Sequence, residues 1–150
     1  MEVCTIVGFE EVGKNMTAVK INDDVIIFDA GVHLPAVIEM QEEGQQTYSE
    51  KQLRHSGGIP NDLVLDKLGW RDKVRAIVIG HAHLDHVGAV PYLAYRYPKA
   101  EIIGTSFTMH FLETILKDEK LHIKNKRKTI RENSSMIIQG KNEKYKIEFI

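Results

Sequence analysis

Residues 74–86 read Val-Arg-Ala-Ile-Val-Ile-Gly-His-Ala-His-Leu-Asp-His, so a hydrophobic run leads directly into three histidines and one aspartate. A short apolar run bounded by turn residues is typical of a buried strand, and open sheets place their chemistry at the ends of such strands. Imidazole nitrogens and carboxylate oxygens are the ligands that zinc and similar divalent metals prefer. The alternative is a group of surface histidines on a polar loop, but the preceding strand and the ligand chemistry favour a metal site. The stretch therefore predicts a metal centre at a strand end, formed by His81, His83, Asp85 and His86.

The spacing within this cluster suits two metal ions. Because side chains alternate along an extended backbone, His81 and His83 point the same way and can bind one ion. Asp85 and His86 lie one turn further on and can reach a second ion. Two ions about 3.5–4 Å apart can hold a bridging hydroxide and polarise a phosphoryl or carbonyl group. Since a catalytic zinc takes about three protein ligands, these side chains are too few for two ions, and we expect the others beyond Ile150 rather than among His33, His55, His110 and His122.

The composition narrows the class of protein. The chain has 150 residues, of which 43% are hydrophobic, and this predicts one globular domain. A net charge of −1 gives no global basic field of the kind that marks many nucleic-acid-binding proteins. The single cysteine, Cys4, excludes an intrachain disulfide framework. We expect no membrane association, because no apolar run approaches the roughly 20 residues of a membrane span, and a cytoplasmic location, because no secretory signal is visible.

The remaining sequence predicts an α/β (α+β layered) fold with a mixed sheet. The opening third favours antiparallel strands, and helices then alternate with strands. We interpret the polar residues 39–58 as a long irregular excursion over the surface, and Ser106 as the residue that caps a helix to about residue 117. Residues 145–150 alternate like a strand that no turn closes, which predicts a piece of a longer protein. The expected strands are 3–7, 17–21, 25–28, 74–79, 101–103, 136–138 and 145–150, and the expected helices begin near 60, 88 and 106.

Several motifs together resemble a known family. The cluster has the form His-x-His-x-Asp-His, which is the signature of the metallo-β-lactamase fold. The further motifs 13–16 (Gly-Lys-Asn-Met), 26–31 (Ile-Ile-Phe-Asp-Ala-Gly), 80–93 and 104–105 are similar to the N-terminal part of ribonuclease J, archaeal-type, in the β-CASP group. The resemblance implies an αββα fold of which residues 1–150 form only the N-terminal half. It implies that the remainder of that domain and the β-CASP domain are absent from this chain.

The same resemblance implies a function and a set of roles. The implied activity of the full-length protein is zinc-dependent RNA cleavage, as a 5′–3′ exonuclease, an endonuclease or both. A complete site would hold two Zn²⁺ ions. His81 and His83 would bind the first ion, Asp85 and His86 would bind the second, and Asp85 would also act on a proton during attack. Asp29 would not bind a metal itself, but its carboxylate would lie near the metals and orient one of the ligands. The family's further ligands follow a strand like 145–150, so we expect this chain alone to be inactive.

Other interpretations remain open at this point. The chain could belong to a metallo-β-lactamase-fold hydrolase that acts on a thioester, a lactone or a different phosphodiester, or it could be a non-catalytic metal-binding fragment. Asp29 before Ala-Gly also suits an Asx turn, and residues 13–15 suit a tight turn better than a phosphate-binding nest. The basic residues near 120–131 suit a solvated loop better than an RNA-binding patch. A truncated sheet exposes an edge, so we expect a homo-oligomer.

Overall fold

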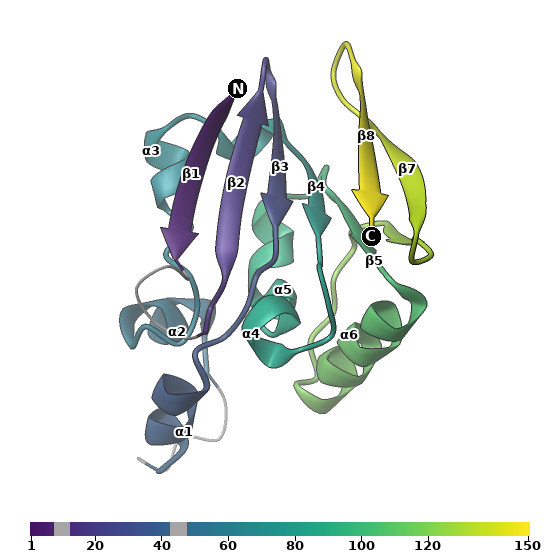
Figure 1. The fold of residues 1–150 in the computed structure, drawn as a ribbon. Helices are drawn as coiled ribbons and strands as arrows, with labels where there is room; N and C mark the ends of the chain where they lie inside the picture. The colour runs from purple at the N-terminus through teal and green to yellow at the C-terminus, as the bar shows by residue number, and fades with distance from the viewer. Residues whose placement is uncertain (8–12, 43–47) are drawn as a thin grey trace.

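A mixed six-stranded sheet forms the centre of the protein. The computed structural model describes residues 1–7, 13–42 and 48–150. The sheet has the order β1-β2-β3-β4-β5-β6, as Figure 1 shows for its first strands. β1, β2 and β3 pair antiparallel, whereas β3, β4, β5 and β6 run parallel. The predicted mixed sheet is therefore confirmed, with strands at Glu2–Val7, Met16–Ile21, Asp24–Phe28, Val74–Val78, Glu101–Gly104 and Arg127–Thr129.

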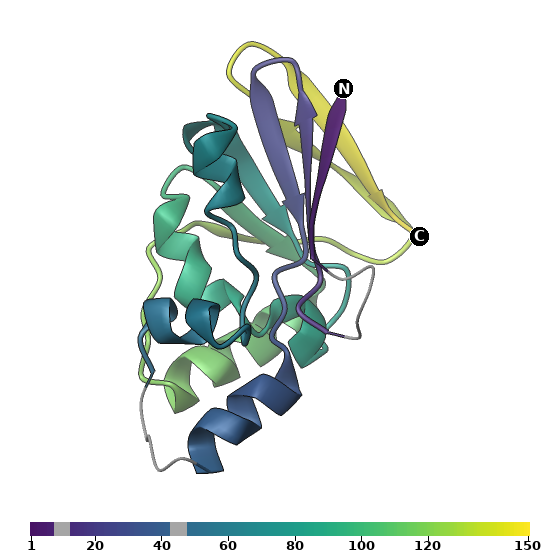
Figure 2. The same cartoon turned by 90° about the vertical axis from the view of Figure 1, so that its left-hand side faces the viewer.

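The helices cover one face of this sheet. Figure 2 shows them on one side, with the hairpin of β7 (Ser134–Gln139) and β8 (Lys144–Phe149) on the other. The helix-side core is built from buried apolar side chains of the strands and of the segments that cross over them, such as Ile27, Ile77 and Leu93. The helices are α1 (Leu34–Glu42), α2 (Glu50–His55), α3 (Val64–Lys67), α4 (Leu84–Val87), α5 (Val90–Leu93) and α6 (Ser106–Asp118), with 3-10 turns η1 (Arg71–Lys73) and η2 (Ala94–Arg96).

The β7–β8 hairpin packs on the opposite face through a second, smaller apolar cluster, which includes Val78, Ile138 and Ile147. Asp24, which is only 3% exposed, joins the hairpin to the sheet. Its carboxylate accepts hydrogen bonds from the backbone N–H of Lys141 at 3.0 Å and the hydroxyl of Tyr145 at 2.9 Å. Burial by itself would raise the pKa of Asp24, but these bonds and the guanidinium of Arg75 outweigh it and lower the pKa.

Two expectations about the helices are wrong. Residues 39–58 are not irregular where the structure describes them, because α1 extends to Glu42 and α2 follows a capping box between Ser49 and Gln52. The cap of α6 is Thr105 rather than Ser106: the side chain of Thr105 accepts the backbone N–H of Thr108 at 3.2 Å. The sequence places a serine and a threonine side by side, and propensity alone does not decide between them.

A membrane-spanning helix is not found among the residues that the structure describes.

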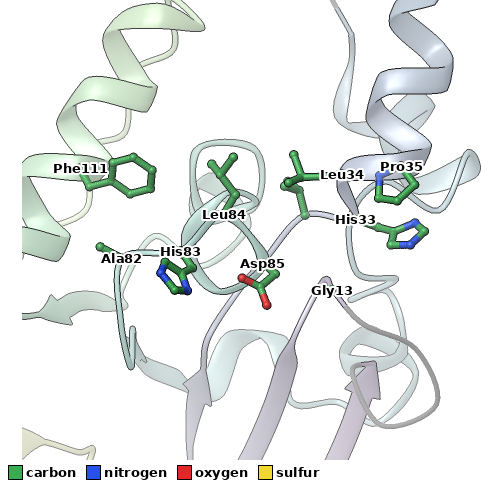
Figure 3. Close-up of a pocket in the computed structure, with 10 residues that line it drawn as sticks. Gly13, His33, Leu34, Pro35, Ala82, His83, Leu84, Asp85 and Phe111 are labelled. Atoms are coloured by element: carbon green, nitrogen blue, oxygen red, sulfur yellow. The ribbon is translucent and has the colours of Figure 1, made fainter.

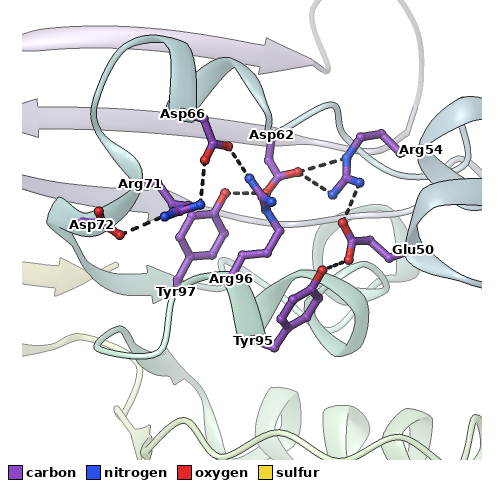
Figure 4. Close-up of polar contacts among 9 residues, drawn as sticks. All are labelled: Glu50, Arg54, Asp62, Asp66, Arg71, Asp72, Tyr95, Arg96 and Tyr97. Atoms are coloured by element: carbon purple, nitrogen blue, oxygen red, sulfur yellow. Dashed lines mark hydrogen bonds and ion pairs between the residues drawn. The ribbon is translucent and has the colours of Figure 1, made fainter.

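A buried ion network fixes the segment between β3 and β4 (Figure 4). Asp62 is fully buried, and Arg54 donates to its Oδ1 at 2.8 Å while Arg96 donates to its Oδ2 at 2.7 Å. The hydroxyl of Tyr97 donates to the same Oδ2 at 2.5 Å. Burial, and then the neighbouring Asp62 carboxylate, raise the pKa of Tyr97, so its hydroxyl remains a donor. The network therefore ties α2 to the segment that follows the histidine cluster.

Candidate metal centre

The site forms where the parallel strands β3 and β4 end side by side. Asp29 follows β3 with a φ of 61°, a left-handed conformation that aspartate adopts more readily than most residues. Its backbone N–H donates to the carbonyl of Val78 at 2.8 Å, and its Oδ1 accepts the backbone N–H of Gly80 at 2.8 Å. An Asx turn would need the N–H of Gly31, which instead donates to the carbonyl of Asn15 at 3.1 Å. The Asx-turn alternative is therefore wrong, and Asp29 joins the two strand ends.

The other oxygen of Asp29 orients His86. Oδ2 of Asp29 accepts the N–H at Nδ1 of His86 at 2.8 Å. This assigns the proton to Nδ1 and leaves the lone pair of Nε2 free for a cation. The contact is the one that the sequence-based prediction for Asp29 requires. Nε2 of His86 in turn lies 3.4 Å from Oδ2 of Asp85.

His81 and His83 meet the same site from the loop after β4. Nε2 of His81 lies 2.9 Å from Nδ1 of His83, and the ring centroids of His81 and His86 are 3.9 Å apart. Burial lowers the pKa of His81, as do the neighbouring rings of His86 and His83, while Asp29 and Asp85 oppose this shift. The neutral imidazole that results has the lone pair that metal binding needs.

Three side chains bring potential metal-binding atoms close together. One ligand atom from each of His81, Asp85 and His86 lies within 4.8 Å of the others. This set of two imidazoles and one carboxylate fits a divalent cation such as zinc or iron. The structure therefore groups His81 with Asp85 and His86, and places His83 against His81. How the four side chains divide between two ions stays a prediction.

Two further residues, Asn15 and Gly31, shape the site and were not predicted from the sequence to do so. Asn15, read as part of a turn, donates from Nδ2 to the carboxylate of Asp85 at 3.2 Å, and the same Nδ2 lies 3.3 Å from Nε2 of His86. Gly31 packs so closely on α4 that a Cβ there would lie 1.6 Å from the carbonyl oxygen of Asp85. The Asp-Ala-Gly motif signalled Gly31, whereas no local pattern separates Asn15 from an ordinary turn residue.

A cavity of about 730 Å³ opens beside the cluster (Figure 3). His83 and Asp85 line it together with the apolar side chains of Leu34, Leu84 and Phe111, which lie above them in this view. His33, which was not expected among the metal ligands, also lines this cavity. Among the residues that the structure describes, the lining is Gly13, Val32, His33, Leu34, Pro35, Ala82, His83, Leu84, Asp85 and Phe111.

The basic segment after α6 is partly ordered as β6 rather than forming only a loop. Lys128 pairs with Glu101 at 2.6 Å, and Arg127 pairs with Glu113 at 3.0 Å. These ion pairs neutralise part of the positive charge. The segment therefore has less unpaired charge for RNA phosphates than its composition suggests.

Sequence comparisons link this chain to known proteins. The model of the Metallo-beta-lactamase superfamily matches residues 10–145. Ribonuclease J of Methanocaldococcus jannaschii is 41% identical over 126 residues, which cover 83% of this chain and 28% of that protein. Ribonuclease J of Pyrococcus abyssi is 42% identical over 120 residues, which cover 80% of this chain and 26% of that protein. The chain thus spans about a quarter of the length of these curated relatives.

A solved structure shares the fold. The crystal structure of a protein of unknown function from Enterococcus faecalis V583 superposes with a TM-score of 0.63 at 18% sequence identity, covering 91% of this chain and 35% of that chain. At this identity the likeness concerns the arrangement of helices and strands alone.

Proposed function

Because the chain belongs to the metallo-beta-lactamase superfamily, we propose that it is the N-terminal part of a metal-dependent ribonuclease of the ribonuclease J type. The observation that carries the proposal is the convergence of His81, Asp85 and His86. Asp29 supports this arrangement by accepting a hydrogen bond from Nδ1 of His86. The sequence likeness to two ribonucleases J supports RNA as the substrate. In the complete protein the reaction would be hydrolysis of a phosphodiester bond.

The side chains of this site have separate tasks in that reaction. His81, His83, Asp85 and His86 would hold zinc, which when bound would supply a Lewis acid that makes water a nucleophile at neutral pH. Asp29 keeps the proton of His86 on Nδ1, and so keeps Nε2 available. Asp85 presents a carboxylate next to that nitrogen, where it can also accept a proton from attacking water. The cavity beside His83 and Asp85 provides space for the nucleotide that adjoins the cleaved bond.

Several finer points belong to the same proposal. We propose two zinc ions per complete site, with the further ligands and a β-CASP domain in other parts of the protein. The match to this chain covers only 28% and 26% of the two ribonucleases J, which supports a longer protein.

The mode of cleavage, from the 5′ end or internal, stays a prediction. So does a homo-oligomer, for which β1 offers a sheet edge that no other strand of residues 1–7, 13–42 and 48–150 pairs with. The expected cytoplasmic location stays a prediction from the sequence alone.

A second candidate function is hydrolysis of a thioester or lactone by the same centre. The apolar side chains of Leu34, Leu84 and Phe111 around the cavity favour it, because they would also accept an acyl chain.

A substrate comparison tests the proposed function. The longer protein is incubated with 5′-labelled single-stranded RNA, a thioester and a lactone, each with zinc, with EDTA, and with zinc restored after EDTA. We expect the RNA to be cleaved, cleavage to stop in EDTA and to return with zinc, since neutral-pH attack needs the metal. Intact RNA together with rapid hydrolysis of the thioester or lactone would replace the first function with the second. Cleavage that continues unchanged in EDTA would contradict both.

A further inference from the structure

The side chain of Asn15 lies against two of the proposed metal ligands at once. Its Nδ2 donates to the backbone carbonyl of Asp85 at 3.0 Å and to Oδ2 of the same residue at 3.2 Å. The same Nδ2 lies 3.3 Å from Nε2 of His86, which is the nitrogen that Asp29 leaves free. An amide NH₂ has two hydrogens. One satisfies the carbonyl, and the other lies between the carboxylate oxygen and the imidazole nitrogen.

The backbone holds Asn15 in this position without help from its side chain. The backbone N–H of Asn15 donates to the carbonyl of Asp85 at 3.0 Å, and its carbonyl accepts the N–H of Gly31 at 3.1 Å. The two preceding residues, Gly13 with φ 116° and Lys14 with φ 42°, make the sharp turn that leads into these bonds. A substitution of the side chain therefore leaves the connection between this turn and α4 in place.

We propose that Asn15 is a positioning residue for the metal ligand Asp85, an inference that rests on the proposed function. By donating to Oδ2, the amide occupies one lone pair of that oxygen and fixes the rotation of the carboxylate. The remaining lone pair then faces the side on which Nε2 of His86 lies, 3.4 Å away. Without the amide, the carboxylate of Asp85 can rotate away from His86, and the two ligands no longer face one cation together. Groups of this kind, next to metal ligands, typically contribute 10- to 100-fold in metal affinity.

The test measures zinc affinity by competition against a chromophoric chelator. The proteins compared are the unsubstituted chain, Asn15→Ala, Asn15→Leu and a control, Asn22→Gly. Leucine matches the shape of asparagine but donates no hydrogen bond. Asn22 also donates from Nδ2 to a carboxylate, that of Glu143 at 2.9 Å, but at an exposed turn. Because Asn22 has a φ of 52°, glycine removes its amide while tolerating the backbone conformation.

We expect both Asn15 variants to bind zinc about 10- to 100-fold more weakly, and Asn22→Gly to bind like the unsubstituted chain. The visible absorption of bound Co²⁺ should change in the Asn15 variants and not in the control, because it reports the ligand arrangement. Melting temperatures in excess chelator separate this role from a structural one. Variants that melt lower in chelator but keep their zinc affinity and Co²⁺ spectrum would overturn the inference. If the longer protein, which would supply the further ligands, binds no zinc without any substitution, the proposed function itself fails, which is a different result.

Discussion

Replacing Asp85 with asparagine is expected to reduce RNA cleavage by the proposed longer ribonuclease at least about 100-fold, the lower end of what a general base contributes. The substitution keeps the shape of the side chain but removes its negative charge and its ability to accept a proton. It also brings an NH₂ group to a place where Nδ2 of Asn15 already donates, 3.2 Å from the carboxylate oxygen. Either the new amide turns its oxygen to Asn15 or the hydrogen bond is lost, and both outcomes leave a weaker metal ligand.

The measurement is the initial rate of cleavage of labelled RNA at saturating zinc. Asp118→Asn is the matched control, because this substitution makes the same change of charge. Asp118 is exposed and is the last residue of α6. Its rate should equal that of the unsubstituted protein. A rate for Asp85→Asn within about twofold of the control would remove Asp85 from the mechanism, since a general base contributes more than that.

Replacing Asp62 with alanine is expected to destabilise the chain by about 3 kcal/mol, because two buried guanidinium groups each lose one of the two carboxylate partners that the structure describes for them. Without Asp62, Arg54 keeps Glu50, and Arg96 keeps Asp66. Arg54 and Arg96 have side-chain exposures of only 10% and 12%, and both donate to the Asp62 carboxylate. The hydroxyl of Tyr97, which donates to the same oxygen as Arg96, also loses its acceptor. Urea unfolding followed by circular dichroism measures this loss.

Asp72→Ala provides the comparison for Asp62. Asp72 also pairs with an arginine, Arg71 at 3.3 Å, but its side chain is 82% exposed. Exposed pairs contribute about 0–1 kcal/mol, so this variant should unfold close to the unsubstituted chain. Equal stabilities of the Asp62 and Asp72 variants would show that the buried network in Figure 4 does not hold the fold together.

The sequence predicted the parts of the molecule in which local pattern and tertiary packing agree. The apolar run before the histidines is β4, and the cluster does lie at its carboxyl end, beside the end of β3. The opening antiparallel strands followed from their alternation and from the turn at 22–24. Asp29 was placed near the cluster by the family resemblance, and its contact with His86 fits that expectation.

The rest depended on contacts between distant residues, which no local pattern contains. β6 has only three residues, Arg127–Thr129, and it is a strand because it pairs with β5. Its arginine and lysine favour a loop by composition. Asn15 reaches Asp85 across a separation of 70 residues, so its role follows only from the fold. The helices at 34–42 and 50–55 were missed because they bury little against the core: the first has no buried residue and the second buries Leu53.

Anomalous diffraction above the zinc absorption edge, from crystals grown with zinc, tests the metal centre most directly. We expect a peak between His81, Asp85 and His86, at about 2.0–2.2 Å from imidazole nitrogen and carboxylate oxygen atoms. Crystals that hold zinc elsewhere on the chain, with these three side chains turned apart toward solvent, would contradict it.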